Sequence, residues 1–335
     1  MLRLGFDFCD GDPCVFIKEG IMLGTYVDDL ILIGEQDIVS LTKRQLSEIV
    51  KIKDLGPASH FVGFTIRRLS SERLTIDQGC YIEDTLKEFN MSECAGVASP
   101  CVPGNWPEED NSEPFDEVVY RKAVGRLLYV ANCTRPDIAF AESRLSRFNH
   151  CPTIFKWKEL KRVLRYLKET LFFKLHFVKC NGVLNAYCDA DWANDKSDSI
   201  SVGGCLINMG GPVIWRSKKQ GLVATSTVMA EYISMYDCCR ELDWHVEFLN
   251  EVRFCFRVPA VLFCDNQGAI SIANSRKVSQ QTKHIRFRYH FVRECVSLGT
   301  VVLKYVCSKE NVADVFTKGL SGPCTADFCK SLGLA

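Results

Sequence analysis

Short apolar runs alternate with helical patterns through the first hundred residues. The runs predict strands over residues 14–17, 21–26, 30–33, 61–66 and 74–76. Apolar residues recur at helical spacing between Ile38 and Ile52, which predicts a helix. The second and third strands form a hairpin around Asp28 and Asp29, and because both arms are apolar we expect it to be packed on both sides. Strands alternating with helices favour an α/β or α+β unit.

The pattern changes after residue 98. Prolines, glycines and the acidic stretch 108–114 predict a linker. Residues 120–148 are mostly helical, with a restart at 134–137 where Thr134 can cap and a proline follows at an early helical position. The helix after it has an apolar stripe from Trp157 to Leu167. We expect its opposite side to expose six cations, namely Lys156, Lys158, Lys161, Arg162, Arg165 and Lys168.

A new unit begins near residue 183. Its apolar runs predict strands over 183–188, 201–207, 212–215, 261–264 and 301–306. Helical patterns cover 228–252, 267–274, 290–298 and a closing helix at 312–320. This order predicts a mixed sheet flanked by helices. The fold class is therefore α/β (α+β).

Composition narrows the classes of protein. The 335 residues are 47% hydrophobic and 24% charged, which excludes a disordered chain, a collagen-like fibre and a small disulfide scaffold. Lys plus Arg and Asp plus Glu are 41 each, so any site for nucleic acid must be a local patch. No apolar run approaches the ~20 residues that span a bilayer, so we expect no membrane partner. No targeting signal is visible, and we expect an intracellular protein of the cytoplasm or nucleus.

Eighteen cysteines are unusually many. Without a secretory signal we expect them to be reduced and buried as small hydrophobic groups. The chain has no CxxC motif, which argues against a structural zinc site.

Four acidic residues in the last unit lie beside apolar neighbours. Asp189 and Asp265 follow apolar strands, while Glu231 and Asp314 lie within apolar helical patterns. Each one alone is better explained as a surface cap or a turn residue. Together they predict a divalent-metal site, because buried carboxylates repel one another and hard oxygen ligands select Mg²⁺ or Mn²⁺. Two such ions about 4 Å apart can act on a phosphodiester. Asp28 and Asp29 also have two interpretations: they are either ordinary turn residues of the hairpin or ligands of a metal site.

A family resemblance spans nearly the whole chain. Tyr26-Val27-Asp28-Asp29 and its apolar arms resemble the active-site hairpin of reverse transcriptases. Further motifs in the family's order resemble a copia-type retrotransposon Pol polyprotein: Lys53–Gly56, Tyr120–Tyr129, Thr134–Ile138, Asp189–Ala193, Trp215–Gln220, Ala230–Tyr232, Cys264–Asn266, Thr282–Ile285 and Ala313–Lys318. The chain resembles the C-terminal part of such a polyprotein.

The resemblance implies four segments. Residues 1–98 would be a partial reverse-transcriptase palm, 99–182 a linker and mostly helical thumb or connection, 183–322 a ribonuclease H-like domain, and 323–335 a tail. It also implies that Asp189, Glu231, Asp265 and Asp314 hold two Mg²⁺ or Mn²⁺ ions. Asp191 is expected to be a neighbour rather than a ligand.

The chain departs from the family pattern at several points. The family's polymerase uses a third aspartate upstream of the hairpin, and this chain lacks that segment. Asp28 and Asp29 would then form only a partial polymerase metal site, and polymerisation would be lost unless a complementary chain completes the palm. Val228 and Arg286 replace acidic residues of the family, but neither is among the four carboxylates.

Two basic segments are candidate nucleic-acid contacts. Each is explained equally simply as a solvated helix face. Their proposed contact residues are Lys158, Lys161, Arg162, Arg165, Lys283, Arg286 and Arg288. His284 is a further candidate for positioning substrate or moving a proton.

The leading hypothesis is a truncated reverse transcriptase with a ribonuclease H domain that hydrolyses the RNA strand of RNA/DNA hybrids. The alternatives are an inactive remnant that binds nucleic acid, and a chain that aggregates through exposed strand edges.

Overall fold

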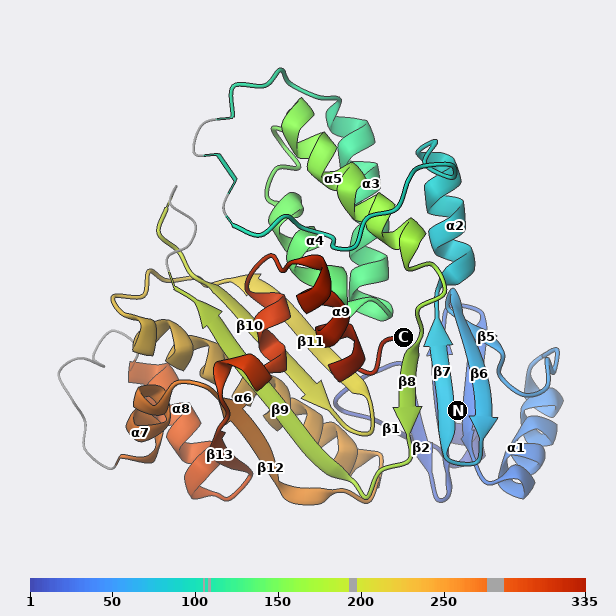
Figure 1. Ribbon diagram of the computed structural model, residues 1–335. Coiled ribbons are helices and arrows are strands. Elements are labelled where there is room, and N and C mark those ends of the chain that lie inside the picture. The colour runs from blue at the N-terminus through green and yellow to red at the C-terminus, as the bar shows by residue number, and fades with distance from the viewer. Residues whose placement is uncertain (105, 108–109, 193–197, 276–285) are drawn as a thin grey trace.

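Three β-sheets and a helical unit make up the computed structural model, which describes residues 1–104, 106–107, 110–192, 198–275 and 286–335 (Figure 1). Both sheets and helices contribute extensively, so the predicted α/β (α+β) class is confirmed. Among the described residues, no helix is long and apolar enough to cross a membrane.

The first sheet is antiparallel, in the order β1-β2-β3-β4. Its strands are β1 (Asp7–Phe8), β2 (Val15–Lys18), β3 (Ile21–Tyr26) and β4 (Asp29–Gly34). Leu46 of helix α1 (Gln36–Ile49) packs with Ile21 and Leu23 in its core. The expectation that the hairpin is packed on both sides is wrong, since Val27 is 89% and Ile33 55% exposed. Successive side chains of a strand point to opposite faces of the sheet. A helix packed on one face therefore leaves the side chains on the other face exposed.

The second sheet joins distant parts of the chain. Its strands β5 (His60–Phe61), β6 (Phe64–Ser70) and β7 (Arg73–Asp77) are followed by β8 (Leu175–Val178), which pairs with β7 in antiparallel register. Strand β8 lies within the segment that the sequence assigned to a linker and helical connection. A local pattern does not reveal a partner strand so far along the chain.

The helical unit lies between β7 and β8 along the chain. It contains α2 (Gly79–Glu88), α3 (Glu117–Cys133), the 3₁₀ turn η2 (Pro136–Ile138), α4 (Ala139–Ser146) and α5 (Ile154–Glu169). Fully buried Tyr120, Leu127 and Leu164 belong to its core. The predicted cap Thr134 instead ends α3 and donates its hydroxyl proton to Gln78 Oε1 at 2.7 Å.

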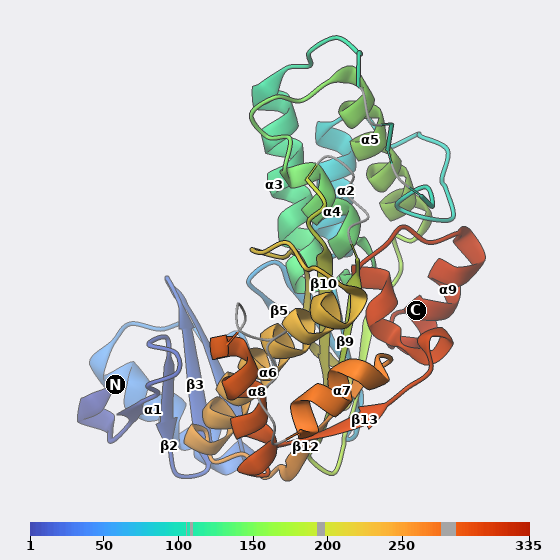
Figure 2. The same ribbon diagram turned by 90° about the vertical axis from the view of Figure 1, so that its left-hand side faces the viewer.

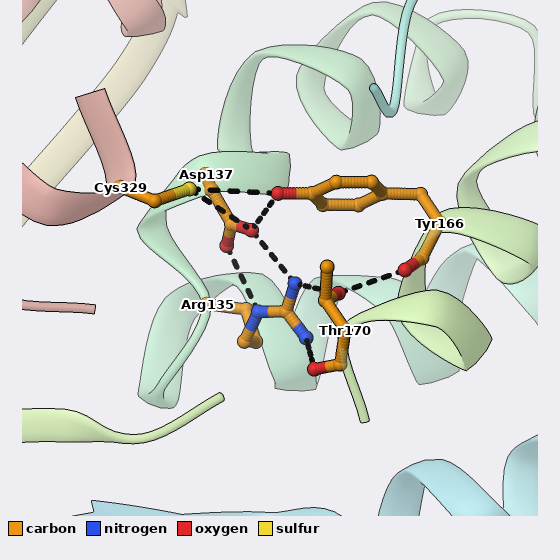
Figure 3. Close-up of polar contacts among 5 residues, drawn as sticks. All are labelled: Arg135, Asp137, Tyr166, Thr170 and Cys329. Atoms are coloured by element: carbon orange, nitrogen blue, oxygen red, sulfur yellow. Dashed lines mark hydrogen bonds and ion pairs between the residues drawn. The ribbon is translucent and has the colours of Figure 1, made fainter. Parts of the chain in front are cut away.

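A buried polar network secures the restart after α3 (Figure 3). Arg135 donates to both carboxylate oxygens of Asp137, at 3.0 and 2.7 Å, and to the carbonyl oxygen of Thr170 at 3.1 Å. The hydroxyl of Tyr166 donates to Asp137 Oδ2 at 2.7 Å, and the Cys329 thiol lies beside both groups. The network therefore links η2, α5 and the C-terminal helix.

The third sheet has five strands in the order β11-β10-β9-β12-β13. They are β9 (Val183–Asp191), β10 (Val202–Asn208), β11 (Pro212–Lys219), β12 (Arg257–Cys264) and β13 (Val301–Tyr305). Strands β9, β10 and β11 are antiparallel neighbours, whereas β12 runs parallel to both β9 and β13. The predicted mixed sheet is confirmed.

Helices cover both faces of this sheet (Figure 2). Helices α6 (Thr227–Glu251), α7 (Gln267–Asn274) and α8 (Arg286–Ser297) share one apolar core with it. On the other face lie the 3₁₀ turn η5 (Val312–Phe316) and helix α9 (Gly322–Ser331), which pack with Leu206 of β10. The 3₁₀ turn η4 (Ser308–Glu310) precedes η5 along the chain. The predicted closing helix 312–320 is wrong: the N–H of Thr317 bonds to the carbonyl three residues back, on Asp314. Gly204 lets η5 lie directly on β10, because an added Cβ would stand 2.9 Å from the Ala313 carbonyl oxygen.

The C-terminal segment, expected to be a tail, packs against the rest of the chain. It carries most of α9, and Leu332 and Leu334 are buried. A β-bridge joins Leu334 to Leu175 at the start of β8.

Candidate metal centre

The four carboxylates come from four separate elements. Asp189 lies near the end of β9, and Asp265 directly follows β12. Because β9 and β12 are parallel, with Cys188 opposite Cys264, both aspartates lie at the same end of the sheet. Glu231 lies near the start of α6, and Asp314 lies in η5 on the opposite face of the sheet.

The structure brings these side chains together. One carboxylate oxygen each of Asp189, Asp265 and Asp314 all lie within 4.8 Å of one another. Glu231 and Asp265 oxygens form a second such group with the sulfur of Cys264. Asp265 belongs to both groups, so the four predicted carboxylates and one thiol form a continuous cluster.

Burial makes negative charge costly at this cluster. Asp189, Glu231 and Asp314 are 5%, 7% and 8% exposed. Burial, and after it the charge of Asp314, together raise the pKa of Asp189 to about 7, against the opposing hydrogen bond from Thr317. Burial also raises the pKa of Glu231 to about 10, with the charge of Asp189 adding to the effect. Protonation at neutral pH relieves the repulsion when no cation is bound.

A lysine and a threonine partly offset the negative charge of the cluster. Lys318 Nζ lies 2.8 Å from Asp314 Oδ2, and the Thr317 hydroxyl donates to Asp189. Within the described part of the chain, Glu231 Oε2 is buried and has no hydrogen-bond partner. A buried acceptor without a donor is costly, so a divalent cation is a fitting partner for these oxygens.

The backbone beneath the cluster is held by side chains from both faces of the sheet. The Ser234 hydroxyl of α6 donates to the Asp189 carbonyl oxygen at 2.7 Å. The Asn311 amide donates to the Cys188 carbonyl oxygen at 3.0 Å and also caps η5 through the Ala313 N–H. These contacts fix β9 relative to α6 and η5, which carry Glu231 and Asp314.

The Asp28-Asp29 pair lies elsewhere, at the exposed turn between β3 and β4. In the described ranges, neither aspartate belongs to a group of three ligand atoms within 4.8 Å of one another. The partial polymerase metal site therefore stays a prediction.

The two predicted basic surfaces, on α5 and at the start of α8, differ in how many of their basic side chains are exposed and how many are hydrogen-bonded to the chain. On α5, Lys158 is exposed and Lys161 partly exposed, while Arg162 donates to Ser99 Oγ at 3.1 Å and Arg165 to the Ala95 carbonyl oxygen at 2.7 Å. These two arginines secure the chain between helix α2 and the acidic stretch 108–114. Figures 1 and 2 place α5 and α8 on opposite sides of the molecule, so they do not form one surface.

The expectation that Lys156 is exposed is wrong. Lys156 is 5% exposed, lies 3.5 Å from Asp110, and its ammonium is 4.3 Å from the Trp106 ring centre. The linker covers the first turn of α5, and a lysine with a long apolar stem is well suited to lie beneath it.

The second basic segment is only partly described. Arg288 stacks its guanidinium over the Tyr236 ring at 5.4 Å. Arg286 begins α8. Lys283 and His284 lie outside the described residues, so their predicted roles stay predictions.

Sequence reasoning missed three members of the site: Cys264, Thr317 and Lys318. All three stand beside a predicted ligand or within the last motif, Ala313–Lys318. Cys264 was missed because the search for thiol ligands relied on CxxC spacing. A site that combines the sulfur of Cys264 with the carboxylates of Asp265 and Glu231 needs no such spacing, because its ligands come from a strand end and from a helix.

Comparisons with known proteins extend this description. Residues 2–103 match the family of reverse transcriptases (RNA-dependent DNA polymerases). The chain is 36% identical over 325 residues to the retrovirus-related Pol polyprotein from transposon TNT 1-94 of Nicotiana tabacum, covering 92% of this chain and 24% of that protein. It is 34% identical to the corresponding polyprotein from transposon RE1 of Arabidopsis thaliana, covering 100% of this chain and 23% of that protein.

These matches define the class as reverse-transcriptase-related proteins. Over nearly its whole length the chain is similar to the Pol polyproteins of copia-type retrotransposons, as its motifs predicted. It spans about a quarter of the length of the curated relatives that it matches.

Solved structures are more distant. LC11 ribonuclease H1 in complex with an RNA/DNA hybrid is 12% identical, covers 40% of this chain and 93% of its own, and has a TM-score of 0.32. The foamy viral protease-reverse transcriptase in complex with double-stranded DNA is 10% identical, covers 85% of this chain and 46% of its own, and has a TM-score of 0.48.

Proposed function

We propose that residues 183–322 form a ribonuclease H that hydrolyses the RNA strand of RNA/DNA hybrids with two Mg²⁺ or Mn²⁺ ions. The observation that carries the proposal is the convergence of Asp189, Glu231, Asp265 and Asp314 at one end of the five-stranded sheet. Similarity to the Pol polyproteins supports nucleic acid as the substrate class.

Two groups of oxygens would hold the ions. Asp189, Asp265 and Asp314 would hold one, and Glu231 with the shared Asp265 the other. Two bound divalent ions supply an activated water and stabilise the leaving oxygen of a phosphodiester.

The surrounding residues keep the ligands in place. Thr317 orients the Asp189 carboxylate through its hydroxyl, and Lys318 neutralises part of the charge on Asp314. Burial of Asp189 and Glu231 limits access of bulk water, which strengthens their interaction with a cation.

We further propose the segment division given by the resemblance, with residues 1–98 as a partial palm, 99–182 as linker and helical connection, 183–322 as the nuclease domain and 323–335 as its C-terminal extension. Nucleotide addition by Asp28 and Asp29 needs another carboxylate, which the described residues do not bring to the hairpin. Lys158 and Lys161 are proposed to contact phosphates from α5.

The test is release of labelled RNA from an RNA/DNA hybrid by the full chain, with Mg²⁺ and with a chelator. Asp189→Asn, Asp265→Asn and Asp314→Asn should each lower the cleavage rate by orders of magnitude without unfolding the protein. Asp327→Asn is the matched control. Because Asp327 is 79% exposed on α9, the variant should cleave the hybrid at the parent rate.

Cleavage by Asp189→Asn at the parent rate would refute the assignment. Folded protein that binds the hybrid without cleaving it would instead support the alternative of a nucleic-acid-binding remnant. Circular dichroism of each variant separates loss of activity from loss of the fold.

A further inference from the structure

The candidate metal centre contains a thiol that the proposed reaction does not use. Cys264 is the last residue of β12 and is fully buried. Its sulfur, a Glu231 oxygen and an Asp265 oxygen all lie within 4.8 Å of one another. The other side of the centre, formed by Asp189, Asp265 and Asp314, offers oxygen alone.

Two observations indicate that the sulfur is available as a ligand. The N–H of Asn266 donates to the Cys264 sulfur at 3.4 Å, so the sulfur already acts as an acceptor in this fold. Independently, the neighbouring Glu231 is 93% buried, since it is 7% exposed, and its Oε2 has no partner among the described residues. A cation between the two groups would satisfy both.

The ligand set selects the type of cation. Thiolate sulfur is a soft donor that favours Zn²⁺ and its analogue Cd²⁺ over Mg²⁺, which prefers oxygen and water. Tetrahedral zinc needs sulfur at about 2.3 Å and oxygen at about 2.0 Å. Ligand atoms that lie within 4.8 Å of one another need to close by roughly 1 Å to reach that geometry.

We propose that Glu231, Cys264 and Asp265 form a binding site for a thiophilic divalent cation of the Zn²⁺ type. Because Asp265 and Glu231 also belong to the proposed magnesium centre, such an ion displaces the catalytic ions and inhibits cleavage. The inhibition rests on the proposed function, whereas the binding site itself does not.

Other buried thiols of the same core provide a contrast. Cys239 lies on α6 and is fully buried, and it is hydrogen-bonded to Cys295 of α8. Neither residue belongs to a described group of metal ligands. Cys239→Ser therefore removes a core thiol without touching the proposed site.

The experiment is a Cd²⁺ titration of the full chain after its accessible thiols are capped with iodoacetamide. In the described part of the chain, the exposed thiols are Cys14, Cys80, Cys151, Cys255, Cys307 and Cys324. The ultraviolet charge-transfer band between thiolate and cadmium is then recorded for the parent, Cys264→Ser, Cys264→Ala and Cys239→Ser.

The parent and Cys239→Ser should show the band with one tight Cd²⁺ site. Both Cys264 variants should lose the band, and their Cd²⁺ dissociation constant should rise at least tenfold. An equal band in the parent and in folded Cys264 variants would overturn the proposal. Should the variants not fold, X-ray absorption of the zinc-loaded, capped parent decides: one sulfur neighbour supports the site, and a shell of oxygen and nitrogen alone overturns it.

Inhibition is measured separately. Zn²⁺ added to the Mg²⁺-dependent cleavage reaction should inhibit the parent at least tenfold more strongly than Cys264→Ser, each relative to its own rate. Absence of cleavage in every sample would count against the proposed function, and the charge-transfer band would still decide the metal site.

Discussion

Binding of Mg²⁺ to the carboxylate centre should release protons. In the metal-free protein the pKa of Asp189 is about 7 and that of Glu231 about 10, so both are mostly protonated near pH 6. A metal ligand must be deprotonated, and filling both positions therefore displaces close to two protons near pH 6 and close to one near pH 8.

The magnitude follows from those two values. Each displaced proton raises the affinity tenfold per pH unit. Over the interval from about pH 6 to pH 8, Glu231 contributes about 100-fold and Asp189 about tenfold. The product of the two association constants should thus rise about 1000-fold.

Calorimetry in two buffers of different ionisation enthalpy measures the released protons directly. Glu231→Gln is neutral at every pH, so it should release about one proton fewer and bind more weakly. The surface variant Asp327→Asn should match the parent. Proton release near zero at pH 6, with Mg²⁺ bound, would refute the reasoning, because the carboxyls would then be ionised before the metal arrives.

The same shift affects stability without metal. The pKa of Asp189 in the folded state lies above its unfolded value of 3.8, so the folded protein binds more protons. Its contribution is fully present below about pH 4 and is lost as the pH rises through 7. The loss is at most about 4 kcal/mol, and added Mg²⁺ should restore it.

Three further predictions concern residues around the centre and in the helical unit. Thr317→Val removes the hydrogen bond that opposes the raised pKa of Asp189, so Mg²⁺ affinity near neutral pH should fall several-fold, as a titration will show. Arg135→Ala leaves the Asp137 charge buried without its partner, and should lower the free energy of unfolding by about 3–5 kcal/mol in chemical denaturation. Burial raises the pKa of Glu142 to about 7, so ionisation of this side chain should destabilise the fold above that pH by about 3 kcal/mol. Glu142→Gln should abolish this part of the pH dependence of the melting temperature.

Two of these variants have matched controls. Thr325→Val removes a buried hydroxyl of α9 that donates to the Ser321 carbonyl oxygen and not to a carboxylate, so it should leave Mg²⁺ affinity unchanged. Arg121→Ala loses a half-exposed ion pair and should cost less than 1 kcal/mol. An Arg135→Ala protein as stable as the parent, or a Glu142→Gln protein with unchanged pH dependence, would show that the buried charges are compensated differently.

The local pattern of hydrophobic and polar residues was sufficient to predict most of the helices and strands. Period-two and period-3.6 spacing located the strands and long helices, because burial of one face imposes those periods on the sequence. It did not locate β8, which is a strand only because β7 lies beside it, nor the 3₁₀ turn η5, which is set by close packing on Gly204.

The sequence by itself predicted the family resemblance, the fold class and four carboxylates that could share a metal, since these follow from residue type and order. Only the tertiary structure decided which of them meet and what joins them. Cys264 enters the centre because β12 delivers it beside Glu231 of α6. Lys156 is buried because the linker covers it, and Arg162 and Arg165 hold the chain rather than standing free. Charge and burial at a site depend on neighbours that are distant in sequence, and folding alone brings those neighbours together.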